Sequence, residues 1–241
     1  MDRLAYTAMT AANRTLESLS VRANNLANAN TPGFRADMES AQAVDIKGYG
    51  YDSRHLATVK NDGVDMTPGT LTVTGRDLDF AIRGQGLIAL QDGNGEAYTR
   101  HGSMVVDSEG RLTINGRQVM GEGGPIVLPE YDNVSIGEDG TISVMPRGDY
   151  LMTEVDKIKL VDAPAAELKK NAAGLLVRKD GQPAQATENV RLVSGYLEAS
   201  NVSSIDQLTA TLSLNRTFET QVKMMKAAED MASAGDRLLR D

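Results

Sequence analysis

The chain has 241 residues, of which 41 % are hydrophobic and only 4 % aromatic, so it can bury only a modest core for its length. Its net charge of −8, without any block of like charge, disfavours nucleic acid as a partner, because phosphate binding needs a basic face. Cys is absent, which excludes disulfides and thiolate chemistry.

The chain also lacks the apolar segments that direct a protein to a membrane. No run approaches the roughly 20 apolar residues of a membrane span, so we expect no membrane insertion. The first residues contain no continuous apolar stretch of the kind found in a secretory signal. If the protein leaves the cytosol, we expect another export route, without a cleaved signal peptide.

Both ends of the chain are free of helix breakers, whereas the middle is rich in them. Residues 1–31 contain no Gly or Pro, and residues 184–241 contain no Pro and only Gly195 and Gly235. Gly and Pro interrupt regular helix, so the pattern predicts two helical ends around a turn-rich, β-forming middle. A chain that builds one element from its two ends is usually built to pack with other chains.

The first helix is predicted over residues 2–29. An apolar stripe at steps of three and four consists of Leu4, Ala8, Ala12, Leu16, Leu19, Ala23 and Leu26. The stripe is thin because several members are Ala, so the helix needs neighbours to stabilise it. Another chain is one such neighbour, and the helix's own domain is the alternative.

The end of this helix is marked by four Asn within residues 24–30, followed by Pro32, Gly33 and Phe34. Asn favours helix ends, and Pro-Gly suits the centre of a type II turn in which Gly takes a positive φ. Phe34 then supplies an apolar anchor. A simple capped helix end is one interpretation. Pairing of the Asn side chains with the backbone or with Asn of neighbouring helices is the other.

The second helix is predicted over residues 203–239, with Ser203 or Ser204 as its cap. The residues expected to share its apolar face are Ile205, Leu208, Leu212, Phe218, Val222, Met225, Ala228 and Ala232. Asn215 interrupts this stripe, and a polar residue in an apolar seam often sets the register between helices. We therefore expect residues 1–35 and 199–241 to pair as a coiled-coil-like helical domain.

The middle of the chain divides into two parts. Residues 36–78 are predicted to form an extended, irregular linker. Residues 79–198 are predicted to form a central all-β domain, a sandwich or partial barrel, because short strand-like segments recur about every ten residues between Gly-containing turns. The turn signal at 92–95 predicts a hairpin. The expected fold class is α+β.

No catalytic, cofactor-binding or metal-binding residues are predicted. His55 and His101 stand alone in the sequence. Residues 92–96 begin like a calcium loop, but Ala97 and Ser103 occupy the positions that need Gly and Glu. The glycine clusters at 84–86 and 121–124 do not form a phosphate-binding fingerprint.

Two terminal motifs carry a family resemblance. Residues 24–35, Asn-Asn-Leu-Ala-Asn continuing to Thr-Pro-Gly-Phe-Arg, resemble the N-terminal signature of the bacterial flagellar rod and hook proteins. Residues 195–202, Gly-Tyr-Leu-Glu-Ala-Ser-Asn-Val, and residues 216–219, Arg-Thr-Phe-Glu, resemble their C-terminal signature. Residues 98–103 and 107–112 look like the central β motif that these proteins share.

Within this family, three segments favour a proximal rod protein over the distal one. They are residues 1–3, residues 65–69 and residues 121–126. One departure is Leu87-Ile88, where the distal rod and hook relatives commonly carry Phe-Phe. This departure fits a proximal rod subunit, and a distal rod or hook-type subunit is the alternative within the family.

The resemblance implies a structural subunit of the flagellar drive shaft, located in the rod that crosses the periplasm. Its terminal helices would form an inner tube around the export channel, and its β domain would form an outer layer. The implied partners are copies of itself, other rod proteins above and below it, the flagellar type III export apparatus and candidate surrounding ring proteins. Neither helical stripe offsets much ordering entropy, so we expect the free ends to be frayed before assembly.

The stripes and the signatures together predict an assembly interface. Its residues are Leu4, Leu16, Leu19, Asn24, Asn25, Leu26, Asn28, Pro32, Gly33, Phe34, Leu197, Glu198, Ser200, Asn201, Val202, Leu208, Leu212, Arg216, Phe218, Val222 and Met225. An alternative of another class is a β domain that binds or cleaves cell-wall glycan. It would need a carboxylate pair, for which Asp77, Asp79 and Glu96 are available.

Overall fold

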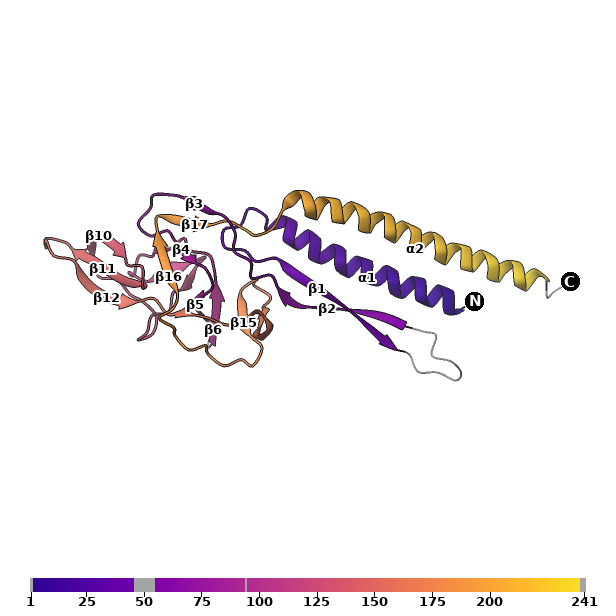
Figure 1. Ribbon diagram of the computed structural model, residues 1–241, viewed down its shortest axis with the longest axis horizontal. Helices are drawn as coiled ribbons and strands as arrows, with labels where there is room; N and C mark the ends of the chain where they lie inside the picture. The colour runs from indigo at the N-terminus through magenta and orange to yellow at the C-terminus, as the bar shows by residue number, and fades with distance from the viewer. Residues whose placement is uncertain (1, 46–54, 94, 239–241) are drawn as a thin grey trace. The chain divides into compact units, whose positions relative to one another are not determined.

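A computed structural model describes residues 2–45, 55–93 and 95–238 (Figure 1). The chain divides into two compact units. The helical unit comprises Met1–Ala27, Asp37–Asp62 and Ser203–Asp241, and the β unit comprises Asn28–Ala36 and Gly63–Val202. Helices at both ends and strands between them confirm the predicted α+β class.

The described residues of the helical unit form two helices and two strands. Helix α1 spans Asp2–Ala27 and helix α2 spans Ser204–Leu238, close to the predicted bounds. The two helices lie side by side and run in opposite directions (Figure 1). Strands β1 (Asp37–Asp45) and β2 (His55–Val64) pair with each other, and β1 contacts α1.

Polar contacts tie α1 to its neighbours. Towards α2, the Thr15 hydroxyl donates to Gln221 Oε1 at 3.1 Å and Arg22 Nη1 donates to Gln207 Oε1 at 3.4 Å. On the side of β1, the Asn25 amide exchanges two hydrogen bonds with the Asp37 backbone, at 2.8 and 3.0 Å. The seam between the helices is thus partly polar, unlike the apolar seam of an ordinary coiled coil.

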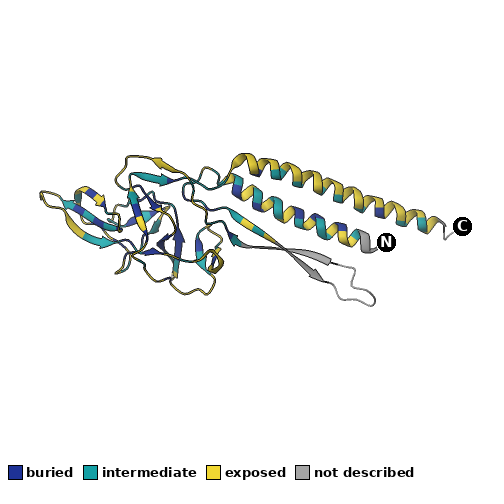
Figure 2. Cartoon of the chain, viewed as in Figure 1, coloured by how far each residue is buried: buried dark blue, intermediate teal, exposed yellow. Residues whose placement is uncertain are grey.

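The single apolar face predicted for α2 is wrong, because its members lie on two faces. Phe218 follows Gln207 and shares its α1-facing side at steps of three and four, and it is half-buried. Leu208 and Leu212 are 50 % and 62 % exposed. The step of six residues from Leu212 to Phe218 turns the helix by about 240°. Leu208 and Leu212 therefore lie on a different face of the helix from Phe218. Figure 2 shows how much of α2 is exposed.

The stripe predicted for α1 also divides. Ala8 and Ala12 are buried, whereas Leu16 is 48 % exposed and Ala23 is exposed. Each step of four residues turns the helix about 40° beyond a full turn, so a run of such steps leaves the buried face. The side chain of Leu4 lies outside the described residues.

The β unit is built of short antiparallel strands. They are β3 (Leu71–Val73), β4 (Phe80–Arg83), β5 (Leu87–Asp92), β6 (Gly95–Thr99), β7 (Val105–Val106), β8 (Leu112–Ile114), β9 (Arg117–Gln118), β10 (Tyr131–Ile136), β11 (Thr141–Pro146), β12 (Thr153–Lys157), β13 (Leu160–Val161), β14 (Leu168–Lys170), β15 (Leu176–Arg178), β16 (Arg191–Ser194) and β17 (Tyr196–Glu198), with a short 3-10 helix at Ala165–Glu167. The largest sheet has the order β13-β5-β6-β15-β14, and others are β10-β11-β12 and β7-β8-β9. Pairing of Asp92 with Gly95 confirms the predicted hairpin.

Strand β5 lies at the centre of the β unit, with both faces buried. Ile88 and Leu90 belong to the larger apolar cluster, and Leu87 and Ala89 belong to a second cluster around Tyr98. Successive side chains of a strand point to opposite faces, so one continuous apolar run serves two cores. The segment is therefore apolar at every position and shows no alternation of apolar and polar residues.

The prediction of an irregular linker over residues 36–78 differs from the structure. The segment contains β1, β2 and β3. Strand β1 is largely polar, so its sequence carries no apolar alternation. Its contacts with α1 include a hydrogen bond from the Ser18 hydroxyl to Glu39 Oε2 at 2.7 Å. Tertiary pairing therefore decides this segment, and local propensity does not.

Candidate functional site

The segment that follows α1 and the segment that precedes α2 meet inside the β unit. We call this region the junction, and it consists of residues 33–36, 65–69, 100, 170 and 198–201. Two backbone hydrogen bonds define it: Gly33 N donates to Glu198 O at 2.7 Å, and Asp65 N donates to Ala36 O at 2.9 Å. Parts of both segments that resemble the flagellar signatures, residues 33–35 and 198–201, lie here.

The turn that enters the junction is the predicted type II turn at Pro32-Gly33. Phe34 N donates to Thr31 O at 3.2 Å, and Gly33 has a φ of 69°. A side chain at Gly33 would also collide with the backbone of Arg100. Glycine is therefore required here both for its conformation and for the close approach of two chain segments.

Glu198 is the centre of the junction and is 1 % exposed. Its Oε1 accepts hydrogen bonds from Arg35 Nη2 at 2.5 Å and from Gly69 N at 2.8 Å, and its Oε2 accepts one from Arg100 Nε at 2.8 Å. A side chain at Gly69 would overlap the carbonyl of Ala199, so the backbone can approach the carboxylate only as glycine. One carboxylate thus joins three other segments of the chain.

Two buried guanidinium groups face this single carboxylate. Arg100 also donates to the carbonyl oxygens of Gly86 and Gly84, each at 2.8 Å. Burial lowers the pKa of Arg100, and the hydrogen bond and charge of Glu198 oppose this shift. Nε and Nη1 of Arg35 have no hydrogen-bond partner among the described residues. The group carries more positive than negative charge, and Glu198 supplies the counter-charge to both guanidinium groups.

Asn201 and Lys170 complete the junction. Asn201 Oδ1 accepts from Ala36 N at 2.8 Å, and its Nδ2 donates to the carbonyl of Asp65 at 3.0 Å. Lys170 Nζ donates to Arg35 O at 2.6 Å and lies 3.8 Å from the centroid of the Phe34 ring, a cation–π contact. The side chains of Asn201 and Lys170 form hydrogen bonds with backbone of the same chain, so they hold its segments together at the junction.

The structure places the predicted interface residues in three different settings. Exposed on the helices are Leu16, Asn24, Leu208, Leu212, Arg216 and Val222. Half-buried or buried in the helical unit are Leu19, Asn25, Leu26, Phe218 and Met225. In or beside the junction of the β unit are Asn28, Pro32, Gly33, Phe34, Leu197, Glu198, Ser200, Asn201 and Val202. The first set is exposed on the helices, whereas the carboxylate of Glu198 is engaged within its own chain.

Sequence reasoning missed several residues of the junction as site residues, among them Arg35, Gly69, Arg100 and Lys170. The available signal was the position of Arg35 and Arg100 inside the motifs that resemble the flagellar proteins. Arg is almost never fully buried unless it is paired, so an Arg inside such a motif is a candidate for a buried ion pair. The pairing itself could not be predicted, because Arg100 and Glu198 lie far apart in the sequence.

Two of the carboxylates considered for catalysis, Glu96 and Asp79, form ion pairs. Glu96 accepts a hydrogen bond from Lys159 Nζ at 2.6 Å, and Asp79 lies 3.3 Å from Arg76 Nη1. Burial lowers the pKa of His101, although the charge of Asp79 opposes this shift. His55 has its side chain outside the described residues, as does Asn94 of the calcium-like segment. Among the residues described, no group of three or more acidic or His side chains is placed to hold a metal ion.

Over the same described residues, none of the helices combines the length and apolar character needed to cross a membrane.

Comparison with known proteins shows that parts of the junction and of both helices lie in segments that match flagellar protein families. Models of three families match the chain: "Flagella basal body rod protein" at residues 6–35, "Flagellar hook protein FlgE/F/G D1 domain" at residues 81–144, and "Flagellar basal body rod FlgEFG protein C-terminal" at residues 193–238. The two terminal matches include the segments that meet at the junction.

Whole-chain relatives agree with these matches. The flagellar basal-body rod protein FlgF of Escherichia coli (strain K12) is 41 % identical, over 99 % of this chain and 99 % of its own length. FlgF of Salmonella typhimurium is 40 % identical over the same shares, and FlgG of Bacillus subtilis (strain 168) is 28 % identical over 96 % of this chain and 97 % of its own. The chain therefore belongs to the family of flagellar basal-body rod proteins, as a structural subunit of the rod.

Proposed function

We propose that this rod subunit polymerises helically through the exposed faces of its terminal helices and forms part of the proximal rod. The polymer is a hollow shaft that transmits torque and encloses the export channel. Its partners are copies of the same chain and other rod proteins. The chain reaches the periplasm through the flagellar type III export apparatus, without a cleaved signal peptide, and has no catalytic activity.

Exposed apolar side chains on the helices are the observation that carries this proposal. On α2, Ile205 is 76 % exposed, Leu208 50 % and Leu212 62 %. On α1, Tyr6 is 56 % and Leu16 48 % exposed. Exposed apolar stripes of this kind on a water-soluble chain mark protein–protein contacts. The helices therefore offer surfaces for further helices after they have packed on each other.

The kind of interface indicates how an assembly of these chains would extend. The exposed stripes of α1 and α2 differ in sequence, so a contact between them joins two different surfaces. Such a heterologous contact extends into a helical polymer when its rotation does not close a ring. A tube of helices is the expected result.

A substitution on α2 tests the proposal. Leu212→Asp places a charge on the exposed stripe, where it should block assembly while the β unit stays folded. Ser213→Asp is the matched control, because Ser213 is exposed on the same turn but is not part of the stripe. Electron microscopy of basal bodies should show truncated rods without hooks for Leu212→Asp and complete rods for Ser213→Asp. Complete rods from both variants would contradict the proposal.

We also propose that the helices gain order on assembly. Their seam buries small and polar side chains, including Ala8, Ala12 and Thr15, so little apolar area offsets the ordering entropy. Amide hydrogen exchange should be fast in α1 and α2 of the free chain and slow in rods. Strong protection of α1 in the free chain would contradict this part of the proposal.

Further experiments distinguish the two alternative functions from the proposed one. A distal rod or hook-type subunit fits the same helices, and localisation of the chain along isolated rods distinguishes it. A glycan-cleaving β domain would need a free carboxylate pair, but Glu96 is paired with Lys159 and Asp79 with Arg76. Release of soluble fragments from purified cell wall by the full chain would favour that alternative.

A further inference from the structure

The chain passes between the helical unit and the β unit four times. These passages lie between residues 27 and 28, 36 and 37, 62 and 63, and 202 and 203. The covalent path for a force on the helices therefore consists of four backbone segments. The bonds that hold these segments where they enter the β unit decide how such a force is shared.

The side chain of Asn201 joins three of the entering segments. Its Oδ1 accepts a hydrogen bond from Ala36 N at 2.8 Å, and its Nδ2 donates to Asp65 O at 3.0 Å and to Thr67 O at 3.1 Å. Asp65 N in turn donates to Ala36 O at 2.9 Å. Ala36 lies directly before the second passage, Asp65 shortly after the third, and Asn201 shortly before the fourth. Each of these three segments is therefore bound to the other two.

The segment that follows the first passage is held by the same stretch of chain. Gly33 N donates to Glu198 O at 2.7 Å. Glu198 lies in the same strand end as Asn201 and precedes it by three residues. Residues 198–201 thus bind a segment next to each of the other three passages, and all of these bonds lie inside the β unit.

Asparagine is suited to this position by its chemistry. Its amide group carries two N–H donors and a carbonyl acceptor in one plane. At Asn201 the acceptor serves the N–H of Ala36, and the donors serve carbonyl groups of residues 65 and 67. An aspartate at this position would keep only the acceptor, and an alanine would keep neither.

Hydrogen bonds between the entering segments change how a force is distributed. Without them, each segment extends separately, and the shortest one carries most of the force. With them, displacement of one segment displaces the others, so several bonds must break together before any segment is pulled out. Local opening requires less free energy than global unfolding, so these bonds matter most for a force that enters at the passages.

We propose that Asn201 is a positioning residue that ties the entering segments together, so that a force on the helices is shared among them when it reaches the β unit. The inference rests on the proposed transmission of torque and adds to it the residue that distributes the load. Asn201, which the sequence predicts as an interface residue, then acts within its own chain.

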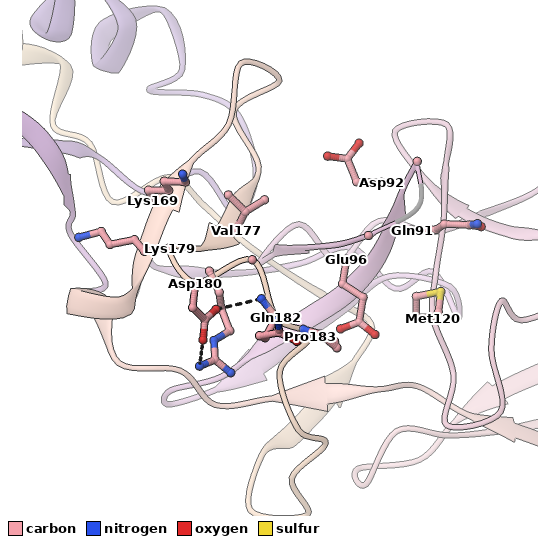
Figure 3. A pocket seen from close by; sticks show the side chains of 14 residues that line it. Gln91, Asp92, Glu96, Met120, Lys169, Val177, Lys179, Asp180, Gln182 and Pro183 are labelled. Carbon is pink, nitrogen blue, oxygen red and sulfur yellow. Dashed lines mark hydrogen bonds and ion pairs between the residues drawn. The ribbon is translucent and has the colours of Figure 1, made fainter.

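Single-molecule pulling of the full chain tests this role, because the points at which the force enters can be chosen. In one geometry, handles on the two chain ends load the first and fourth passages. In the other, handles are attached through Ser135→Cys and Gln182→Cys, since the natural chain contains no Cys. Both positions are exposed in the β unit. Gln182 lines a groove of about 830 Å³ (Figure 3), and the described residues that line this groove all lie outside the junction.

Asn201→Ala should lower the force at which the β unit opens when the chain is pulled by its ends, and it should not change the force between residues 135 and 182. Asn201→Asp, which keeps the acceptor for Ala36 N, is a second variant with the same expected direction. Asn189→Ala is the matched control, because Asn189 is exposed in the same unit, and it should change neither force. Equal reductions in both geometries, or no reduction at the ends, would overturn the inference.

Amide hydrogen exchange checks the tie without an applied force. In Asn201→Ala, the Ala36 amide should exchange roughly 2–10-fold faster, which is the change expected for the loss of one hydrogen bond. The Ala89 amide, which donates to Lys159 O in the core of the β unit, should be unaffected. An unchanged rate at Ala36 would contradict the inference.

These outcomes are separate from those of the proposed function. Both measurements use the free chain, so a negative result removes the role of Asn201 and leaves the assembly proposal standing. If the chain is absent from isolated rods, the proposed function itself fails.

Discussion

The helical unit and the β unit bury different kinds of side chain. Among the described residues, the largest fully buried side chains all belong to the β unit, including Phe80, Leu112 and Ile126. The helical unit instead buries Ala8, Ala12, Ala228 and polar groups such as Gln207. At equal length, the helical unit therefore removes far less apolar area from water.

This difference indicates a division of roles. A β unit with closed apolar clusters can be stable as a single copy. A helical unit with a thin, partly polar seam and exposed Leu side chains has less apolar burial to stabilise it as a single copy.

Removal of the central charge of the junction should have the largest effect. Glu198→Gln leaves Arg35 and Arg100 buried without their counter-charge, which should destabilise the β unit by about 3–5 kcal/mol. Denaturant unfolding followed by circular dichroism measures this change. Glu109→Gln is the control, because Glu109 is exposed and pairs only at the surface. A loss below about 1 kcal/mol would mean that the junction does not support the β unit.

Two Leu residues, one in each unit, allow the stabilisation of the two units to be compared directly. Leu112 is fully buried in the β unit, and Leu212 is 62 % exposed on α2. Leu112→Ala should lower the free energy of unfolding by about 2–5 kcal/mol, and Leu212→Ala should change it by less than about 0.5 kcal/mol. Thermal and denaturant unfolding of the free chain check both values. Equal effects would contradict the division between the two units.

A titration in the β unit should have an intermediate effect. Burial, together with the Glu96 carboxylate, raises the pKa of Tyr98 from 10.0 to about 12, although a hydrogen bond from Ala184 N opposes the shift. The folded state keeps the Tyr98 proton while the unfolded chain loses it, so stability should fall as the pH rises from about 10 to about 12. Unfolding of Tyr98→Phe over this range is the control. The variant should lack this part of the pH dependence, and an identical slope would exclude Tyr98 as its source.

The smallest effect is expected at the start of α2. Ser203 Oγ accepts a hydrogen bond from Asp206 N at 3.4 Å and so caps the helix. Ser203→Ala should destabilise α2 by about 1 kcal/mol. Hydrogen exchange in the first turn of α2, followed in rods where the helix is expected to be protected, measures the change, with Ser204→Ala as the control. Loss of protection in the β unit would show that the two units do not respond separately.

The sequence by itself determined the elements that depend on local chemistry. Both helices, the hairpin at 92–95 and the turn at Pro32-Gly33 follow from it, because breaker residues, turn residues and apolar periodicity act over a few neighbours. The signatures around residues 24–35 and 195–202 are likewise continuous stretches of sequence, so they indicate the family without knowledge of the fold.

Only the tertiary structure decided which surfaces are covered. It separated Phe218 from Leu212 on α2, turned the polar segment 37–45 into a strand, and brought Arg35 and Arg100 to Glu198. Each of these depends on segments that are distant in the sequence. A side chain is buried, paired or exposed according to what packs against it, and that information is not local.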